Sequence, residues 1–235
     1  MQESAGGTAA GVASSSCLVV SMVDFKRARQ EMVERQLVRR GISDARVLEA
    51  MRSVPRERFV DPGFEHEAYD DHPLPIAERQ TISQPFIVAC MLEAASLEET
   101  DRLLEIGTGS GYAAAVASRL VSKVDTVERH ATLARKARAT LASLGHDNIE
   151  VHIGDGFLGW PDAAPFDAIL VAAVAGAVPA ELTDQLAVGG RLVIPIRRGT
   201  EQRLIRLTGL GDGRFREDDL GGVSFVPLVR GVAKA

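Results

Sequence analysis

Three glycines spaced two residues apart are the feature that most constrains this chain. They lie in the segment Glu105-Ile106-Gly107-Thr108-Gly109-Ser110-Gly111, between an apolar run at 102–106 and an alanine-rich run at 112–121. The first run predicts a short buried strand and the second a helix, so the glycines form the turn that joins them. Glycine has no Cβ, which permits a tight turn and a close approach of the backbone to a ligand. Ligands of such sheets bind beside the carboxyl ends of the strands, so this turn is a predicted binding site.

The residues after this turn alternate between strand-like and helix-like patterns. Further strands are expected at 123–127, 149–153, 167–171 and 191–196, with helices around 133–144 and 180–187. Strands separated by helices at this rhythm favour right-handed βαβ units and a parallel sheet. We therefore expect an α/β, Rossmann-like, mostly parallel and doubly wound sheet within residues 101–235.

The C-terminal part breaks this alternation. Segments 202–210 and 223–229 resemble strands with no helix between them, and Gly211-Asp212-Gly213 is typical of a turn. We expect these two segments to form an antiparallel strand pair that closes the sheet.

The first hundred residues follow other patterns. Residues 1–21 are rich in Ala, Gly and Ser but have no basic region and no long apolar run, so we expect a disordered leader there. A helix is predicted after Met22 from one apolar stripe, formed by Phe25, Ala28, Met32, Val33 and Leu37. Four prolines interrupt residues 60–85, which predicts a long loop, ordered or disordered, of a kind that often carries function. A single domain is expected over 22–235, in which 22–100 adds N-terminal helices and loops on the substrate side.

The spacing of the glycines narrows the choice of ligand. A dinucleotide-binding turn reads G-x-G-x-x-G and needs glycine where this chain has Tyr112, and no Gly-Lys-Ser/Thr follows for a P-loop. Glu105 would repel phosphates and favour a ligand that carries an ammonium and a sulfonium group. S-adenosyl-L-methionine is such a ligand, with S-adenosyl-L-homocysteine as its product. The residues expected to contact it are those of the turn: Gly107, Thr108, Gly109, Ser110 and Gly111.

Two more acidic residues follow the next strands. Glu128 comes at the end of the second strand, where a carboxylate can accept hydrogen bonds from both ribose hydroxyls. Asp155, with Gly156 beside it, follows the third strand and can accept a hydrogen bond from an adenine amino group. The alternatives are a simple Asp-Gly turn and a glycine-rich turn of some other doubly wound protein.

Composition limits the remaining possibilities. The formal net charge of −5 argues against a general nucleic-acid partner. The two cysteines and five histidines show no metal-ligand spacing, so no metal is expected, and a reduced cytoplasmic location is the simplest interpretation. No apolar run approaches the length of a membrane span.

Several segments resemble the protein-L-isoaspartate (D-aspartate) O-methyltransferase family. The resemblance extends over about residues 32–229, and it is carried by the glycine turn and five further segments: Val54-Pro55-Arg56-Glu57-Arg58-Phe59-Val60, Leu74-Pro75-Ile76, Gln80-Thr81-Ile82-Ser83-Gln84-Pro85, Gly154-Asp155-Gly156 and Gly189-Gly190-Arg191-Leu192-Val193-Ile194-Pro195. The Thr-Ile-Ser-Gln-Pro segment is the most specific, because general methyltransferases lack it. Two places depart from the family: residues 76–79, where the family usually has glycine just before Gln80, and Ala172-Ala173, where it often has Thr-Ala. Both concern peptide preference more than the reaction.

The resemblance implies the class I S-adenosylmethionine methyltransferase fold and a repair activity. It implies methylation of the isoaspartyl carboxylate in damaged proteins and peptides, followed by spontaneous succinimide formation and hydrolysis. Glu105, Glu128 and Asp155 match cofactor-contacting positions of the family, and Ser83 matches its active-site serine. Neither nucleic acid nor a membrane is expected as a partner, and the chain is expected to be a monomer.

An isoaspartyl carboxylate is already ionised at neutral pH, so methyl transfer to it needs no strong base. We therefore expect Ser83, with Thr81 nearby, to orient the substrate and not to act as a nucleophile. Alternatively, both residues only cap a helix that begins near Gln84-Pro85. Two other functions remain open: a methyltransferase for a small-molecule acceptor, and a non-catalytic module that binds an adenosine ligand.

Overall fold

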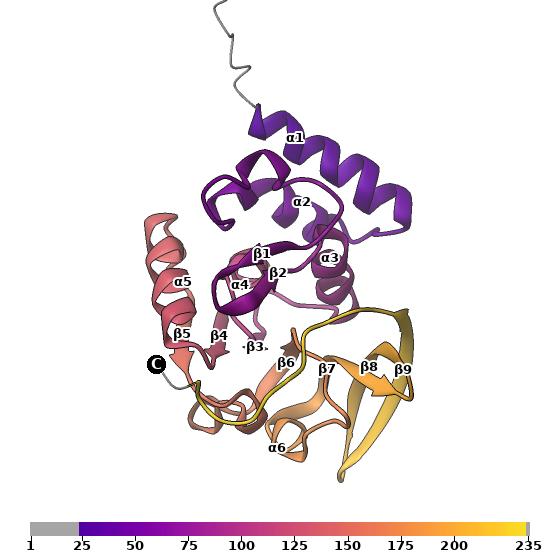
Figure 1. Ribbon diagram of the computed structural model, residues 1–235. Coiled ribbons are helices and arrows are strands. Elements are labelled where there is room, and N and C mark those ends of the chain that lie inside the picture. Colours follow the sequence, from indigo (N-terminus) through magenta and orange to yellow (C-terminus); the bar gives the residue numbers. More distant parts are fainter. Residues whose placement is uncertain (1–23, 234–235) are drawn as a thin grey trace, which may run out of the picture.

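A seven-stranded sheet forms the centre of the protein in the computed structural model, which describes residues 24–233 (Figure 1). The expected leader at 1–21 and the helix start at Met22 lie outside these residues. The strand order is β5-β4-β3-β6-β7-β8-β9. The strands are β3 (Arg102–Ile106), β4 (Lys123–Glu128), β5 (Ile149–Ile153), β6 (Phe166–Val171), β7 (Leu186–Arg198), β8 (Glu201–Gly211) and β9 (Arg214–Gly222). The first five run parallel and the last two antiparallel, which confirms the expected fold class.

Side chains of successive strand residues belong to two separate hydrophobic clusters. Leu103 lies in one cluster and Leu104 in the other, both fully buried, because neighbouring residues of a strand point to opposite faces. The first cluster also contains residues of the helices α2 (Ala45–Ser53), α3 (Pro85–Ala94), α4 (Tyr112–Ala117) and α5 (Ala131–Ser143). The second contains Leu182 of α6 (Ala180–Thr183) and irregular segments around it. Both faces of the parallel strands are therefore covered, which is why these strands are apolar along their length.

The N-terminal stripe does form one continuous helical segment. It begins as α1 (Phe25–Met32), capped by the Asp24 side chain, and continues with a wider turn (Val33–Leu37) and a tighter one (Val38–Arg40). Gly41 ends it in the left-handed region with φ 99°. Glycine adopts this conformation without a Cβ penalty, as is common just past a helix.

One expected strand is wrong. Residues 223–229 form no strand and make a single bridge, between Val174 and Pro227, whereas β9 pairs with β8 from Gly211↔Arg214 onward. Asp212 and Gly213 both have positive φ, 52° and 68°, which is the geometry of a two-residue hairpin turn and lets the strand resume at once. β9 is charged and mostly exposed at the edge of the sheet, so apolar patterning gave no signal for it.

The proline-rich region is built from short ordered elements. It follows a helical turn at Arg56–Arg58 and contains another at Glu65–Glu67 and a small hairpin of β1 (Leu74–Ile76) and β2 (Gln80–Ile82), whose turn is Ala77–Arg79. Of the two possibilities for this loop, the ordered one holds. The hairpin leads directly into α3, so Ser83 lies between a strand and a helix.

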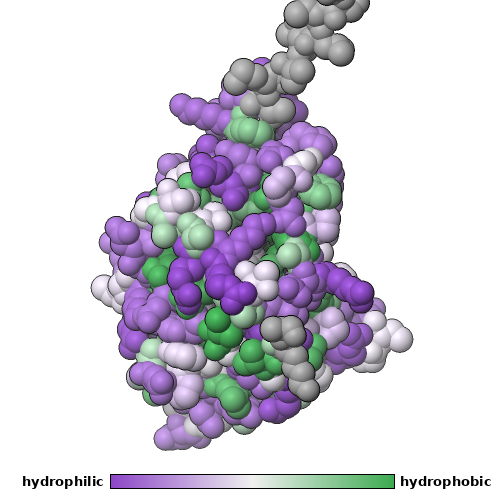
Figure 2. Space-filling model, turned by 60° about the vertical axis from the view of Figure 1, so that its left-hand side comes forward, coloured by the Kyte–Doolittle hydropathy of each residue, from purple (hydrophilic) through white to green (hydrophobic). Residues whose placement is uncertain are grey.

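The face of the protein shown in Figure 2 is mostly hydrophilic, with hydrophobic residues in its middle and lower part. Within residues 24–233, no helix has the length and apolar character that crossing a bilayer requires.

Candidate active site

One large cavity, of about 1200 Å³, lies at the carboxyl ends of the parallel strands. The glycine turn lines one part of it and residues 79–88 line another, so the cavity joins the two segments that the sequence singled out. Of the candidate residues, nine line the cavity: Thr81, Ser83, Glu105, Gly107, Thr108, Gly109, Ser110, Glu128 and Gly156. Gly111 and Asp155 do not.

The turn adopts a backbone that favours glycine at three positions. Gly107, Gly109 and Gly111 have φ values of 95°, 53° and 88°. Gly107 N donates to the Val127 carbonyl at 2.8 Å, which ties the turn to the end of β4. Gly111 is the cap of α4 and packs against α5, where a Cβ would meet Ala137 at 3.3 Å. Its role is therefore to shape the turn without facing the cavity.

Glu105 is buried beneath the turn. Its Oε2 accepts a hydrogen bond from Thr126 Oγ1 at 2.6 Å, and Thr126 lies directly opposite it in the parallel register of β3 and β4. Thr126 Oγ1 also lies 2.7 Å from Thr108 Oγ1. Burial raises the pKa of Glu105 to about 8; the Thr126 hydrogen bond opposes this shift, and the negative charge of Glu128 adds to it. A cationic ligand in the cavity would favour the ionised form.

Glu128 holds two loops with its two carboxylate oxygens. Oε2 accepts from Gly109 N and Oε1 from His130 N, both at 2.9 Å. Each oxygen of a carboxylate can accept more than one hydrogen bond, so the group can still accept from a diol. The carboxylate thereby links the glycine turn to the start of α5.

Asp155 is engaged by the backbone. Its Oδ1 accepts from Phe157 N at 2.9 Å and its Oδ2 from Gly231 N at 2.7 Å. The Asp-Gly turn considered above therefore describes its local contacts, and its contact with the cofactor stays a prediction. Gly156 lines the cavity, and a Cβ at this position would overlap the Ile106 side chain.

Ser83 and Thr81 do not cap α3. The cap residue is Gln84, which makes no side-chain capping bond, and Pro85 begins the helix. Within residues 24–233 the two hydroxyl groups form no hydrogen bond to the protein, and both residues line the cavity. Ser83 is partly buried and Thr81 exposed. The capping alternative is wrong here because the proline supplies the first turn of the helix without a side-chain acceptor.

The segment at 54–60 supports the cavity from behind. Arg56 is fully buried, donates from Nε to the Ala68 carbonyl at 2.6 Å and lies 4.9 Å from the ring of Tyr112. Burial lowers the pKa of Arg56 to about 10. Phe59 packs edge-on against the same ring at 5.6 Å. Tyr112 begins α4, so this segment fixes the helix that follows the glycine turn.

The sequence did not predict the part of the cavity formed by the C-terminal segment. Residues 223–229 line it, and in Figure 1 this segment runs from β9 back across the strand ends toward β5. Two backbone hydrogen bonds of 2.9 Å hold it there: Val174 N donates to the Val226 carbonyl, and Leu228 N donates to the Val174 carbonyl. Further along the chain, Gly231 N donates to Asp155 Oδ2. Pro227 was an available signal, because proline within an expected strand argues against that strand.

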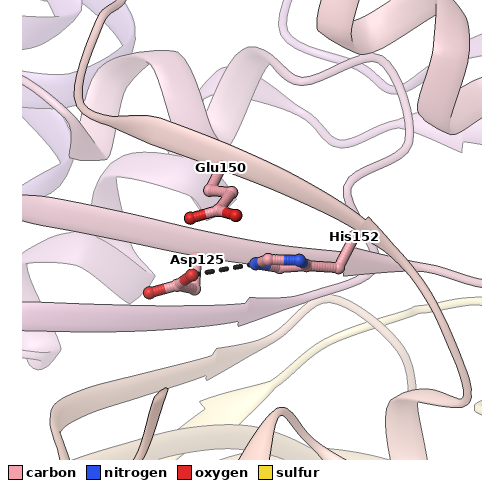
Figure 3. A group of neighbouring side chains, drawn as sticks. All are labelled: Asp125, Glu150 and His152. Atoms are coloured by element: carbon pink, nitrogen blue, oxygen red, sulfur yellow. Dashed lines mark hydrogen bonds and ion pairs between the residues drawn. The ribbon is translucent and has the colours of Figure 1, made fainter. Parts of the chain in front are cut away.

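Among the described residues, one group of His and carboxylate side chains has the spacing of metal ligands: Asp125, Glu150 and His152 (Figure 3). His152 Nε2 lies 2.8 Å from Asp125 Oδ1, and its ring stacks on Trp160. The ammonium group of Lys123 already lies 2.9 Å from Glu150 and 3.7 Å from Asp125. Lys123 thus already places a positive charge beside both carboxylates; that the protein needs no metal stays a prediction.

Comparison with known proteins identifies the family. The sequence model of "Protein-L-isoaspartate(D-aspartate) O-methyltransferase (PCMT)" matches residues 27–233. The chain belongs to this family. It is 59% identical over 202 residues to protein-L-isoaspartate O-methyltransferase 2 of Pelobacter propionicus, covering 86% of this chain and 90% of that protein. It is 56% identical over 212 residues to the protein-L-isoaspartate O-methyltransferase of Methylorubrum extorquens, covering 90% and 92%.

Solved structures of the protein-L-isoaspartate O-methyltransferase family have the same fold. One described by that family name has a TM-score of 0.79 at 29% identity, covering 87% of this chain and 67% of the other. A second, a β-aspartate methyltransferase structure from Plasmodium falciparum in complex with S-adenosyl-L-homocysteine, has a TM-score of 0.75 at 28% identity and covers 86% and 98%. The expected class I methyltransferase fold, the family and the cofactor are thus confirmed.

Proposed function

We propose that this chain methylates the free carboxylate of isoaspartyl residues in damaged proteins and peptides. S-adenosyl-L-methionine supplies the methyl group as an electrophile when bound. The product methyl ester then loses methanol and closes to a succinimide without help from the enzyme. This ring closure begins the repair. The observation that carries the proposal is that one cavity contains both the glycine turn and the segment with Ser83.

The cavity fits this cofactor. Glu105 offers a carboxylate to its cationic end, and Glu128 offers acceptors for its ribose. Gly107 and Gly109 have no side chains, so the backbone there leaves room in the cavity for the cofactor. Asp155 is proposed to accept from the adenine amino group, with Gly156 below the ring.

The chemistry asks little of the protein beyond placement. The substrate carboxylate is ionised at neutral pH, and one of its oxygens forms the new O–C bond as the S–C bond breaks. Opposite charges disappear in this step, so exclusion of water accelerates it. Ser83 and Thr81 are proposed to donate hydrogen bonds that hold the carboxylate or the adjacent peptide backbone in line.

Matched peptides test the activity. The protein is incubated with methyl-labelled S-adenosyl-L-methionine and two peptides that differ only by isoaspartate or aspartate at one position. Label is expected in the isoaspartyl peptide alone. Tight cofactor binding without transfer to either peptide would contradict the proposal and favour a small-molecule acceptor or a non-catalytic binding module.

The role of Ser83 is tested by Ser83→Ala. A hydrogen bond to a charged group contributes about 1.5–3 kcal/mol, so kcat/KM for the isoaspartyl peptide is expected to fall by about 10- to 150-fold. The Kd for S-adenosyl-L-homocysteine, measured by calorimetry, is expected to stay within about two-fold of the original value. An equal loss of cofactor affinity would show that the hydroxyl shapes the cofactor site and does not orient the substrate.

Three further assignments are part of this proposal. The chain acts as a monomer in the cytoplasm. Residues 22–100 form the substrate side and 101–235 the cofactor-binding sheet of one domain. Neither nucleic acid nor a membrane is proposed as a partner.

A further inference from the structure

The turn of the β1–β2 hairpin has an unusual backbone. Glu78 and Arg79 both have φ 58°, although neither is glycine. Side chains other than glycine rarely adopt this left-handed conformation, and two in succession require support from their surroundings. Glu78 Oε2 lies 3.6 Å from His130 Nδ1, and Gln80 Nε2 donates to the Glu78 carbonyl at 3.1 Å. The turn is therefore held against the loop that follows β4.

This support places Arg79 at the mouth of the cavity. Arg79 is exposed, lines the cavity and forms no hydrogen bond or ion pair with any residue between 24 and 233. The other arginines that line the cavity each have a partner: Arg40 binds Asp71 at 2.8 Å, Arg203 binds Asp219 at 3.0 Å, and Arg129 donates to the Gly231 carbonyl at 3.1 Å. Arg79 is thus a cation at the mouth that has no ion-pair partner in the described part of the chain.

The position of Arg79 relative to Ser83 suggests what it binds. Ser83 is four positions after Arg79, and extended chain advances about 3.3 Å per residue, so their Cα atoms are at most about 13 Å apart. A bound extended peptide spans the same distance in three or four residues. The length of the arginine side chain reduces the separation further.

We propose that Arg79 is a specificity-determining residue that favours isoaspartyl peptides with an acidic side chain two to four residues from the isoaspartate. This inference rests on the proposed function. Arg79 attracts the acidic side chain without touching the reacting carboxylate, so its effect appears in the choice between peptides. Because the group is exposed, the preference is modest and falls with salt.

The test uses pairs of isoaspartyl peptides that carry Glu or Gln at one position, two, three or four residues to either side of the isoaspartate. The ratio of kcat/KM for the Glu peptide to that for the Gln peptide is measured for each enzyme, so a general loss of activity or folding cancels. At low salt the original protein is expected to prefer Glu by about two- to five-fold at one or more positions. Arg79→Gln is expected to bring the ratio to about one, and Arg79→Lys to retain most of the preference.

Arg197→Gln provides the matched control. Arg197 is an exposed arginine at the end of β7 that does not line the cavity, so this variant removes the same charge elsewhere and should keep the preference. An equal ratio in the original protein and Arg79→Gln would overturn the proposal, as would the same loss in Arg197→Gln. Isoaspartyl peptides methylated without any acidic preference would overturn this inference alone. No methylation of any isoaspartyl peptide would overturn the proposed function as well.

Discussion

Cofactor binding is expected to strengthen as the pH rises from 6 to 7, because Glu105 must lose a proton to interact with a cationic ligand. Its carboxyl is buried under the glycine turn, and burial raises its pKa from 4.5 to about 8. Without the cofactor, this group is therefore mainly protonated at neutral pH. The positive charge of the bound cofactor favours the ionised form.

The pKa sets the size of the effect. At pH 7 about one molecule in eleven carries ionised Glu105, and at pH 6 about one in a hundred. If the cofactor binds the ionised form, its apparent affinity is about eleven-fold below the intrinsic value at pH 7, equivalent to about 1.4 kcal/mol. Between pH 6 and pH 7 the affinity is expected to rise about nine-fold. Above about pH 8 the amino group of the ligand loses its own proton, so the rise ends there.

Calorimetry in buffers of different ionisation enthalpy measures this directly. Binding of S-adenosyl-L-methionine is expected to release about one proton at pH 6 and slightly less at pH 7. Glu105→Gln keeps the shape of the side chain and its acceptor for Thr126 but cannot ionise. This variant is expected to bind more weakly at pH 7, with little dependence on pH and almost no proton release.

Stability of the cofactor-free protein provides an independent check on Glu105. A folded-state pKa above the unfolded value stabilises the fold below about pH 4.5, and this contribution is lost as the pH rises through about 8. At pH 7 the free energy of unfolding is therefore expected to be about 3 kcal/mol lower than at low pH because of this group. The free energy of unfolding of Glu105→Gln should lack this contribution. The assignment of a proton to Glu105 would be refuted if cofactor affinity did not change between pH 6 and 7. It would also be refuted if stability depended on pH equally in the original protein and in Glu105→Gln.

Two further outcomes are expected. Glu128→Gln should raise the Kd for S-adenosyl-L-homocysteine at least about ten-fold, because the carboxylate accepts from both Gly109 N and His130 N, and unchanged affinity would remove Glu128 from the cofactor site. Gly156→Ala should destabilise the protein by about 1–3 kcal/mol in denaturant unfolding, because its Cβ would overlap a buried isoleucine side chain. Gly176→Ala is the control and should have little effect, because a Cβ there has no atom within 4 Å. Equal effects of the two substitutions would contradict this interpretation.

The sequence predicted the parallel part of the fold because burial there follows from local patterns. β3 and β5 have the predicted bounds, and β4 and β6 are each one residue longer than predicted. These strands are covered on both faces and so are recognisable as short apolar runs. β9 was missed for the opposite reason, since an exposed edge strand can be charged throughout. The only local signal for β9 is the Asp212-Gly213 turn, because the second strand of a two-residue hairpin begins directly after its turn.

The glycine turn between β3 and α4 could be predicted because a glycine acts through its own backbone. Gly107, Gly109 and Gly111 do adopt the positive φ values that their spacing suggests. The contacts of side chains are harder to predict, because they depend on partners that are distant in the sequence. Asp155 contacts the amide of Gly231, 76 residues away, and no local pattern indicates that contact.

Side chains from residues 24–100 contact the part of the chain that forms the sheet. Arg46, in α2, donates to the carbonyls of Leu97 and Leu120, both at 2.6 Å, and so bridges the end of α3 and the segment before β4. Arg56 and Phe59 enclose the ring of Tyr112, the first residue after the glycine turn. Removal of either aromatic contact would therefore loosen the helix on which the cofactor turn depends. The N-terminal segment thus packs behind the glycine turn, and its hairpin lines the same cavity as that turn.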